Sequence, residues 1–178
     1  GPAKWDAYAK IRDLPSMRSY DLVFQPVVAG GRVFFGSTSD DTLYSIDAKT
    51  GEVVWEFTTD GPIRIAPTIA HKRVFFGSDD GFVYCLSEGN GKLIWKFRPD
   101  DAAQAKEKKF LNNGRFIPSA PCRTGVLVDG ETAWFGCGLL PWQSSYLCAI
   151  STVTGRPDGA GHFVKKLSGK TLEGAPAL

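Results

Sequence analysis

Short apolar runs alternate along the chain with clusters of Gly, Asn, Asp and Ser, a pattern that predicts strands joined by tight turns. The clearest runs are Arg32 to Gly36 and Arg73 to Gly77, which both read Arg-Val-Phe-Phe-Gly. Two further runs follow each of them, and the second of these carries a tryptophan. The expected third and fourth strands are Thr42 to Asp47 with Glu52 to Thr58, and Phe82 to Ser87 with Lys92 to Arg98. We therefore expect an all-β protein.

These runs belong to an internal repeat of about 40 residues. Arg32 recurs as Arg73 at an offset of 41, and Trp55 recurs as Trp95 at an offset of 40. A weaker third copy contains Thr132 to Cys137, about 59 residues further on, because a polar segment near 98 to 118 intervenes. A proline marks the start of each expected copy: Pro26, Pro67, Pro121 and finally Pro176. Four antiparallel strands in a unit of about 40 residues predict the blade of a β-propeller.

The repeat also predicts how the chain is divided. We expect an N-terminal extension over 1–19 and propeller repeats over 20–178. The expected units are 20–61, 62–118 with an insertion at 98–118, 119–171, and a partial unit at 172–178. This is a partial propeller of three blades plus the first strand of a fourth. Because closed propellers have four to eight blades, we expect open blade edges that could support self-association.

The turn between the third and fourth strands carries a family resemblance. Ile46 to Trp55 reads Ile-Asp-Ala-Lys-Thr-Gly-Glu-Val-Val-Trp. It resembles the repeat of PQQ-type, or quinoprotein-like, β-propellers, whose units read Leu-Asp-Ala-x-Thr-Gly-x-x-x-Trp. Leu86 to Trp95 is a second copy that lacks the Asp and Thr, while the copy from Ile150 keeps the turn and has no Trp, so that Phe163 is its expected substitute. The resemblance covers roughly residues 20 to 178.

The residues of this motif have an architectural explanation. Asp47 can accept hydrogen bonds from nearby backbone N–H groups, and Gly51 and Gly91 can supply a positive φ. Trp55 and Trp95 can wedge against the adjacent blade while the indole N–H donates to a carbonyl. We expect these five residues to dock one blade on the next.

Charge and composition limit the partners. The 21 Lys and Arg residues against 19 Asp and Glu give a formal net charge of +2, so we expect no nucleic-acid partner. No apolar run approaches the roughly 18 to 20 residues of a membrane helix, and we expect no membrane span. The four cysteines, Cys85, Cys122, Cys137 and Cys148, include no Cys-x-x-Cys pair, which disfavours zinc and covalent haem.

Some propellers with this repeat hold pyrroloquinoline quinone and calcium, and the resemblance raises that possibility here. Those enzymes typically carry adjacent cysteines, a catalytic Asp, and Glu and Asn ligands to calcium, and this chain has no Cys-Cys pair. We therefore expect neither pyrroloquinoline quinone nor calcium, no metal site and no catalytic residue. Asp40-Asp41 and Asp79-Asp80 are interpreted as turn residues that match one another one blade apart.

A candidate ligand face is expected where one blade connects to the next. The residues assigned to it are Arg64, Arg115, Asp79 and Asp80. In the insertion, Asp100-Asp101 can cap a short helix from Ala102 to Lys109 that ends at Asn112-Asn113-Gly114. The face could bind an anionic ligand or an acidic peptide, or it could be a solvated surface under a lid helix.

The turn between the first two strands of the third copy decides whether Cys122 and Cys137 face each other or carry free thiols. A two-residue turn at Asp129-Gly130 would place the two cysteines opposite each other across a hairpin. A three-residue turn from 129 to 131, which alignment of the repeats favours, would put them on opposite faces. On the second register we expect free thiols, and we expect Cys85 and Cys148 to be small buried residues of inner strands.

Two classes of function are consistent with this sequence. The resemblance, which extends to bacterial outer-membrane assembly lipoproteins, implies a non-catalytic binding or scaffold module of a larger protein, located in the periplasm or otherwise outside the cytoplasm. Its partner would be a protein or a small anionic ligand. The alternative is a part of a quinoprotein or haem-linked oxidoreductase whose catalytic residues lie outside this chain.

Overall fold

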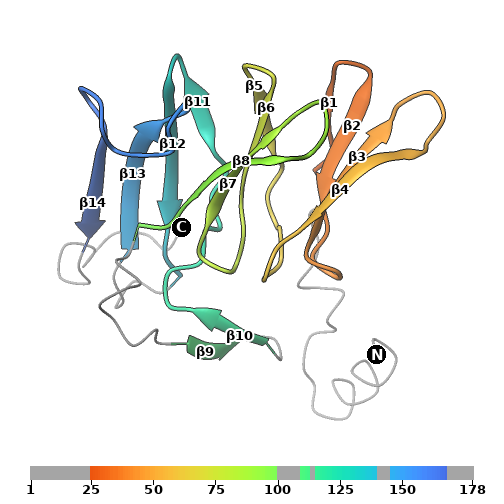
Figure 1. Cartoon of the computed structure of the whole chain (residues 1–178). Coiled ribbons are helices and arrows are strands. Elements are labelled where there is room, and N and C mark those ends of the chain that lie inside the picture. The colour runs from red at the N-terminus through yellow and green to blue at the C-terminus, as the bar shows by residue number, and fades with distance from the viewer. Residues whose placement is uncertain (1–24, 100–108, 113–114, 140–144, 168–178) are drawn as a thin grey trace, which may run out of the picture.

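The computed structural model describes residues 25–99, 109–112, 115–139 and 145–167. Three four-stranded antiparallel sheets stand side by side, and each follows chain order from its first strand to its fourth (Figure 1). The first sheet holds β1 (Val27–Ala29), β2 (Arg32–Gly36), β3 (Thr42–Asp47) and β4 (Val53–Thr58). The second holds β5 (Thr68–Ala70), β6 (Arg73–Gly77), β7 (Val83–Ser87) and β8 (Leu93–Phe97). The third holds β11 (Leu127–Asp129), β12 (Thr132–Cys137), β13 (Ser145–Ser151) and β14 (Phe163–Leu167).

The sequence-based prediction of three propeller blades is confirmed, and we number the blades 1 to 3 in chain order. The expected start of a fourth blade, residues 172–178, lies outside the described residues, and self-association stays a prediction. The described residues form no helix that is long and apolar enough to span a membrane.

Two-residue turns join the first two strands of each blade, and this corrects two predictions for blade 3. The turns are Gly30-Gly31, His71-Lys72 and Gly130-Glu131, because Asp129 pairs directly with Thr132. The turn is therefore neither Asp129-Gly130 nor the three-residue alternative. Pro121 also does not mark the start of the blade, because it lies six residues before Leu127, whereas Pro67 immediately precedes Thr68.

Alternation along β6 sends two neighbouring aromatic rings into two different cores. Phe76 packs with Phe34 and Trp55 of blade 1, whereas Phe75 packs with Trp95 and with Phe135 of blade 3. Successive side chains of a strand point to opposite faces of the sheet, so blade 2 is covered on both sides. The hydrophobic core of the protein is therefore divided into two layers, one at each contact between blades.

The tryptophans of β4 and β8 contact the next blade in the same way. Trp55 Nε1 donates to the Glu88 carbonyl at 2.9 Å, and Trp95 Nε1 donates to the Thr152 carbonyl at 2.9 Å. A Cβ added at Gly91 would lie 2.7 Å from the Trp55 ring. The turn that receives each ring is thus shaped around a glycine, because a side chain there would collide with the indole.

Two arginines reinforce these contacts, and the sequence reasoning gave them no role. Arg32 Nη1 donates to the Glu88 carbonyl at 2.7 Å, the acceptor that Trp55 also uses. Arg73 Nη1 donates in the same way to the Thr152 carbonyl, beside Trp95. Each contact between blades therefore repeats one pair of donors, an Arg from the second strand and a Trp from the fourth.

Blade 3 departs from this pattern at both donor positions. Phe163 pairs with Ala149 just as Trp55 pairs with Ser45, so Phe163 occupies the position of the missing tryptophan. Thr132 takes the place of the arginine, at the start of β12. Neither residue offers the donor found in blades 1 and 2, because a phenyl ring has no N–H and a threonine side chain is too short to reach a neighbouring turn.

Ser45 lies at the same strand position as Cys85 and Ala149, and its Oγ is buried without a hydrogen-bond partner in the described part of the chain. An unsatisfied buried hydroxyl costs roughly 1 to 3 kcal/mol. We therefore expect Ser45→Ala to stabilise the protein by about 1 kcal/mol in urea unfolding. Ser151→Ala is the contrasting variant, because the Ser151 hydroxyl accepts from Val153 N at 3.1 Å, and it should destabilise. A loss of unfolding free energy in Ser45→Ala as large as that in Ser151→Ala, or larger, would contradict this explanation.

The insertion between blades 2 and 3 contains a hairpin where the sequence suggested the end of a helix. β9 (Lys109–Asn112) pairs with β10 (Arg115–Pro118), so Lys109 to Asn112 are extended. The remainder of the expected helix, Asp100 to Lys108, lies outside the described residues. The strand assignment has a physical reason, because the pairing places the apolar residues Phe116 and Leu111 directly opposite each other across the hairpin.

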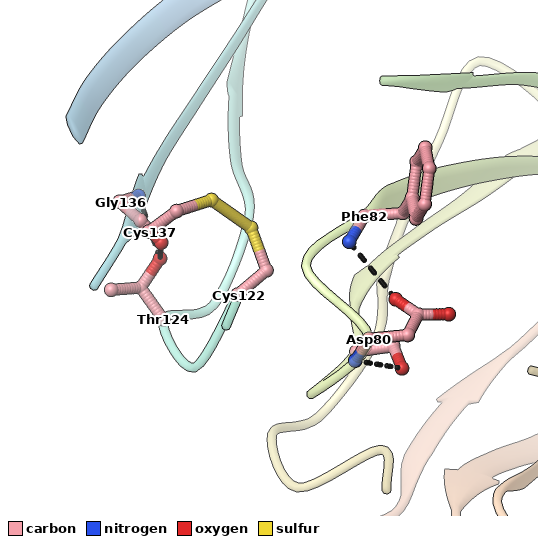
Figure 2. Close-up of a disulfide and its surroundings, with 7 residues drawn as sticks. Asp80, Phe82, Cys122, Thr124, Gly136 and Cys137 are labelled. Carbon is pink, nitrogen blue, oxygen red and sulfur yellow. Dashed lines mark hydrogen bonds between the residues drawn. A yellow bond between two sulfur atoms is a disulfide. The ribbon is translucent and has the colours of Figure 1, made fainter. Parts of the chain in front are cut away.

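The prediction of free thiols at Cys122 and Cys137 is wrong. The two residues form a disulfide with a Cα–Cα distance of 4.4 Å, and Figure 2 shows the bond beside Thr124 and Gly136. Cys122 is not in β11 at all. It lies in the connection before that strand, where neither of the two registers considered from the sequence applies. The Thr124 hydroxyl accepts from Gly136 N at 2.8 Å and donates to its carbonyl, which holds this connection against β12.

Cys85 and Cys148 are free and buried, and burial raises the pKa of each thiol to about 12. At pH 8 only about one molecule in ten thousand would carry a given thiolate. We expect no reaction of the folded, unreduced protein with Ellman's reagent, and two thiols per chain after unfolding in guanidinium. Reduction before unfolding should raise the count to four. Four thiols without reduction would contradict the disulfide.

Candidate binding site at the loop end of the blades

One end of the three sheets gathers the connections between blades. In an antiparallel meander the loop after the second strand and the connection after the fourth lie at the same end. This end, which we call the loop end, carries residues 37–41, 59–67, 78–82 and 119–126. The β9–β10 hairpin also lies there, below the sheets in Figure 1.

Asp79 is the centre of a charged cluster at the loop end. Its side chain is 1% exposed and accepts from Arg64 Nε at 2.8 Å. Arg123 binds the same carboxylate with two donors, Nε and Nη2, at 2.7 Å each. Two guanidinium groups on one carboxylate leave a net charge of +1 at this position. Such paired, charge-assisted hydrogen bonds are the strong geometry for an arginine and a carboxylate.

Both arginines keep donors that Asp79 does not use. Their side chains are each 24% exposed, so they reach solvent while Asp79 stays beneath them. Within the described residues, the terminal nitrogens of Arg64 and Nη1 of Arg123 form no hydrogen bond. Because guanidinium donors match carboxylate and phosphate oxygens, the cluster can accept an anionic group from solution.

Arg123 was missed by the sequence reasoning, although the repeat contains the signal. Pro62-Ile63-Arg64 and Pro121-Cys122-Arg123 are 59 residues apart, the same offset that separates Arg73 from Thr132. The structure places them equivalently, because a Cβ at Gly36 would meet Ile63 and a Cβ at Gly77 would meet Cys122. Placing the start of the third copy at Pro121 hid this match.

Of the other residues assigned to this face from the sequence, Asp80 joins it in a different role. Asp80 Oδ2 accepts from Tyr84 Oη at 2.6 Å, and Oδ1 accepts from Phe82 N at 2.9 Å. Burial raises the pKa of the Asp80 carboxyl. The side chain of Arg115 lies outside the described residues, so the structure does not place it in the cluster.

The two acidic pairs lie in matching turns, as expected, but they are shifted by one residue relative to each other. Asp40 accepts from Tyr44 at 2.7 Å just as Asp80 accepts from Tyr84, so Asp40 corresponds to Asp80. Asp41, with φ of 60°, takes the place of Gly81, with φ of 91°. Asp79 therefore has no acidic counterpart in blade 1, and its buried charge belongs to the contact with the two arginines.

The carboxylates of Asp79 and Asp80 at the loop end are already used in hydrogen bonds. Both oxygens of Asp79 accept from arginines, and both oxygens of Asp80 accept hydrogen bonds. In the part of the chain that the structure describes, no three His, Cys, Asp or Glu residues are grouped so that they could hold a metal ion.

Comparison with known proteins agrees with this architecture. An alcohol dehydrogenase (quinone) dehydrogenase subunit of Gluconobacter oxydans is 34% identical over 161 residues, covering 76% of this chain and 20% of that protein. The quinoprotein ethanol dehydrogenase of Pseudomonas aeruginosa is 30% identical over 117 residues, covering 61% of this chain and 17% of its own length. The outer membrane protein assembly factor BamB of Yersinia pestis is 29% identical, and the match covers 62% of this chain and 27% of that protein. The chain thus spans between about a sixth and a quarter of these relatives.

Solved structures share the fold at low sequence identity. BamB from Moraxella catarrhalis superposes with a TM-score of 0.51 at 18% identity, over 76% of this chain and 33% of that one. A europium-containing methanol dehydrogenase superposes with a TM-score of 0.60 at 16% identity, over 79% of this chain and 24% of that one. The family model described as outer membrane protein assembly factor BamB matches residues 5–158. The chain therefore belongs to this family of PQQ-type propeller repeats.

Proposed function

We propose that this chain is a non-catalytic binding module, and that it takes an anionic group of a protein or of a small molecule at the loop end. The observation that carries the proposal is the cluster of Arg64 and Arg123 on the buried Asp79. Asp79 holds both guanidinium groups in place, so little side-chain entropy is lost when a ligand binds. The guanidinium donors that Asp79 leaves unused favour an anion.

Two further observations support a module that works outside the cytoplasm. Disulfides form and persist in oxidising compartments, and Cys122 is bonded to Cys137 beside the cluster. One of the relatives is an assembly factor for outer membrane proteins, and its name describes a role in assembly rather than catalysis. We extend this to a scaffold role in the periplasm.

Binding of hexaglutamate and of citrate tests the proposal, measured by fluorescence anisotropy with the labelled peptide and by competition with citrate. We expect Arg64→Gln to weaken binding at least about tenfold, since it removes one charge and the free donors. Lys165→Gln removes the same charge from the exposed surface of β14 and should change binding less than about twofold at 0.15 M salt. Binding by Arg64→Gln as tight as that of the parent chain would reject the site.

The relatives named as quinoprotein dehydrogenases make a redox role the second candidate. We propose that this chain by itself binds no pyrroloquinoline quinone, because the carboxylates of Asp40, Asp79 and Asp80 at the loop end already accept hydrogen bonds from Arg or Tyr side chains. Adding the quinone with Ca²⁺ should leave the thermal unfolding midpoint unchanged. A saturable increase with quinone concentration would show binding to the folded state and favour the redox role.

A further inference from the structure

The β9–β10 hairpin exposes an apolar pair at the loop end. Phe116 of β10 is 72% exposed, the most exposed large apolar side chain in the described part of the chain. It pairs directly with Leu111 of β9, which is 64% exposed. Residues directly opposite each other in an antiparallel pair share one face of the sheet. The two side chains therefore form one continuous apolar surface.

The opposite face of the hairpin is anchored to the protein. Ile117, the next residue along β10, points to this opposite face and is 4% exposed. Pro118, at the base of the hairpin, is also buried. Among the described strands, β9 and β10 form a sheet of their own and pair with no blade. A hairpin with two strands is marginally stable in water, and exposing its larger apolar residues is unfavourable. This surface is therefore suited to being covered by another molecule.

The apolar pair lies close to the charged cluster. The base of the hairpin packs on the β6–β7 loop, because a Cβ at Gly81 would lie 3.2 Å from Pro118 Cγ. Gly81 is two residues from Asp79, which holds Arg64 and Arg123. Phe116 lies two residues before Pro118, or about 7 Å along an extended strand. One ligand of a few residues can therefore span both features.

We infer that the loop end binds an extended peptide segment of a partner protein in which an acidic side chain is followed or preceded, within a few residues, by a large apolar one. The inference rests on the proposed anion site and names its ligand class. The carboxylate is bound by the free donors of Arg64 and Arg123, and the apolar side chain covers Phe116 and Leu111. A small anion fits only the first half of this surface, so a peptide is the ligand that uses all of it.

Selection from a displayed library of random twelve-residue peptides tests this, using the full chain and three variants. Phe116→Ser removes the larger apolar side chain, and Arg64→Gln removes the free charge. Val28→Ser is the matched control, because Val28 is also apolar and 70% exposed but lies in β1. Circular dichroism and thermal unfolding of each variant establish that it is folded.

We expect peptides selected on the parent chain to be enriched in an Asp or Glu near a Phe, Leu, Ile or Trp at a preferred spacing. Phe116→Ser should bind the selected peptides at least about tenfold more weakly and should select pools without the apolar enrichment, while its affinity for hexaglutamate stays unchanged. Val28→Ser should behave as the parent chain does. Arg64→Gln should lose the acidic enrichment.

Two failures can be told apart. If Phe116→Ser selects the same peptides with the same affinity as the parent chain, while Arg64→Gln loses binding, the hairpin is not part of the site and the inference is wrong, although the anion site stands. If the parent chain selects no acidic peptide and hexaglutamate does not bind, the proposed function itself is wrong. Selected peptides that are apolar without an acidic residue would overturn the combined ligand class.

Discussion

Replacing Trp55 or Trp95 by alanine will destabilise the protein by roughly 3 to 5 kcal/mol, the usual cost of deleting a large buried aromatic. The two rings are only 8% and 9% exposed, and each fills a core layer between two blades. Each variant also leaves a turn carbonyl, of Glu88 or Thr152, without its indole donor. The loss of unfolding free energy is measured by urea unfolding, provided that the dependence of this free energy on urea concentration is the same in the variant and the parent chain.

Trp55→Phe separates the ring from the hydrogen bond. It keeps an aromatic side chain, as blade 3 does with Phe163, and removes only the N–H and part of the volume. Because the Glu88 carbonyl still accepts from Arg32, we expect a loss of about 1 to 2 kcal/mol. A cost for Trp55→Ala no greater than that for Trp55→Phe would mean that the ring does not dock the blades.

Replacing Gly91 by alanine will destabilise the protein by about 1 to 3 kcal/mol more than replacing Gly51. Both glycines have a positive φ, 67° and 75°, so the two variants share the same backbone strain. They differ in their surroundings, since a Cβ at Gly91 would lie 2.7 Å from the Trp55 ring and one at Gly51 has nothing within 4 Å. The difference between the two variants therefore measures blade docking alone.

A double variant checks that assignment. In a Trp55→Ala background the collision at Gly91 no longer exists, so Gly91→Ala should then cost about as much as Gly51→Ala. The expected coupling between positions 55 and 91 follows from their direct contact. Additive losses in the double variant would show that the glycine is required for its backbone conformation and not for the ring.

Much of the fold could be predicted from the sequence because the signals are local. The turn at Asp47 to Gly51 and the alternating apolar runs depend on residues within one blade, and the recurrence of Arg32 as Arg73 shows that the next blade repeats them. Asp47 Oδ1 accepts from Lys49 N at 2.8 Å and from Thr50 N at 2.9 Å, a contact within four residues. Local preferences of this kind act in any context, so the four-stranded blade, its strand order and the positions of the tryptophans follow from the sequence alone.

The candidate site depended on contacts between blades, which local patterns do not fix. Arg123 meets Asp79 across 44 residues, and Cys122 meets Cys137 across 15, through a connection whose path no strand register describes. The hairpin likewise formed where helix capping signals competed with a cross-strand pairing of apolar residues. The sequence by itself determined the repeating blade, because strand alternation and turn chemistry are short-range. Only the tertiary structure decided which charges meet, since that depends on how each connection packs against the blades on either side of it.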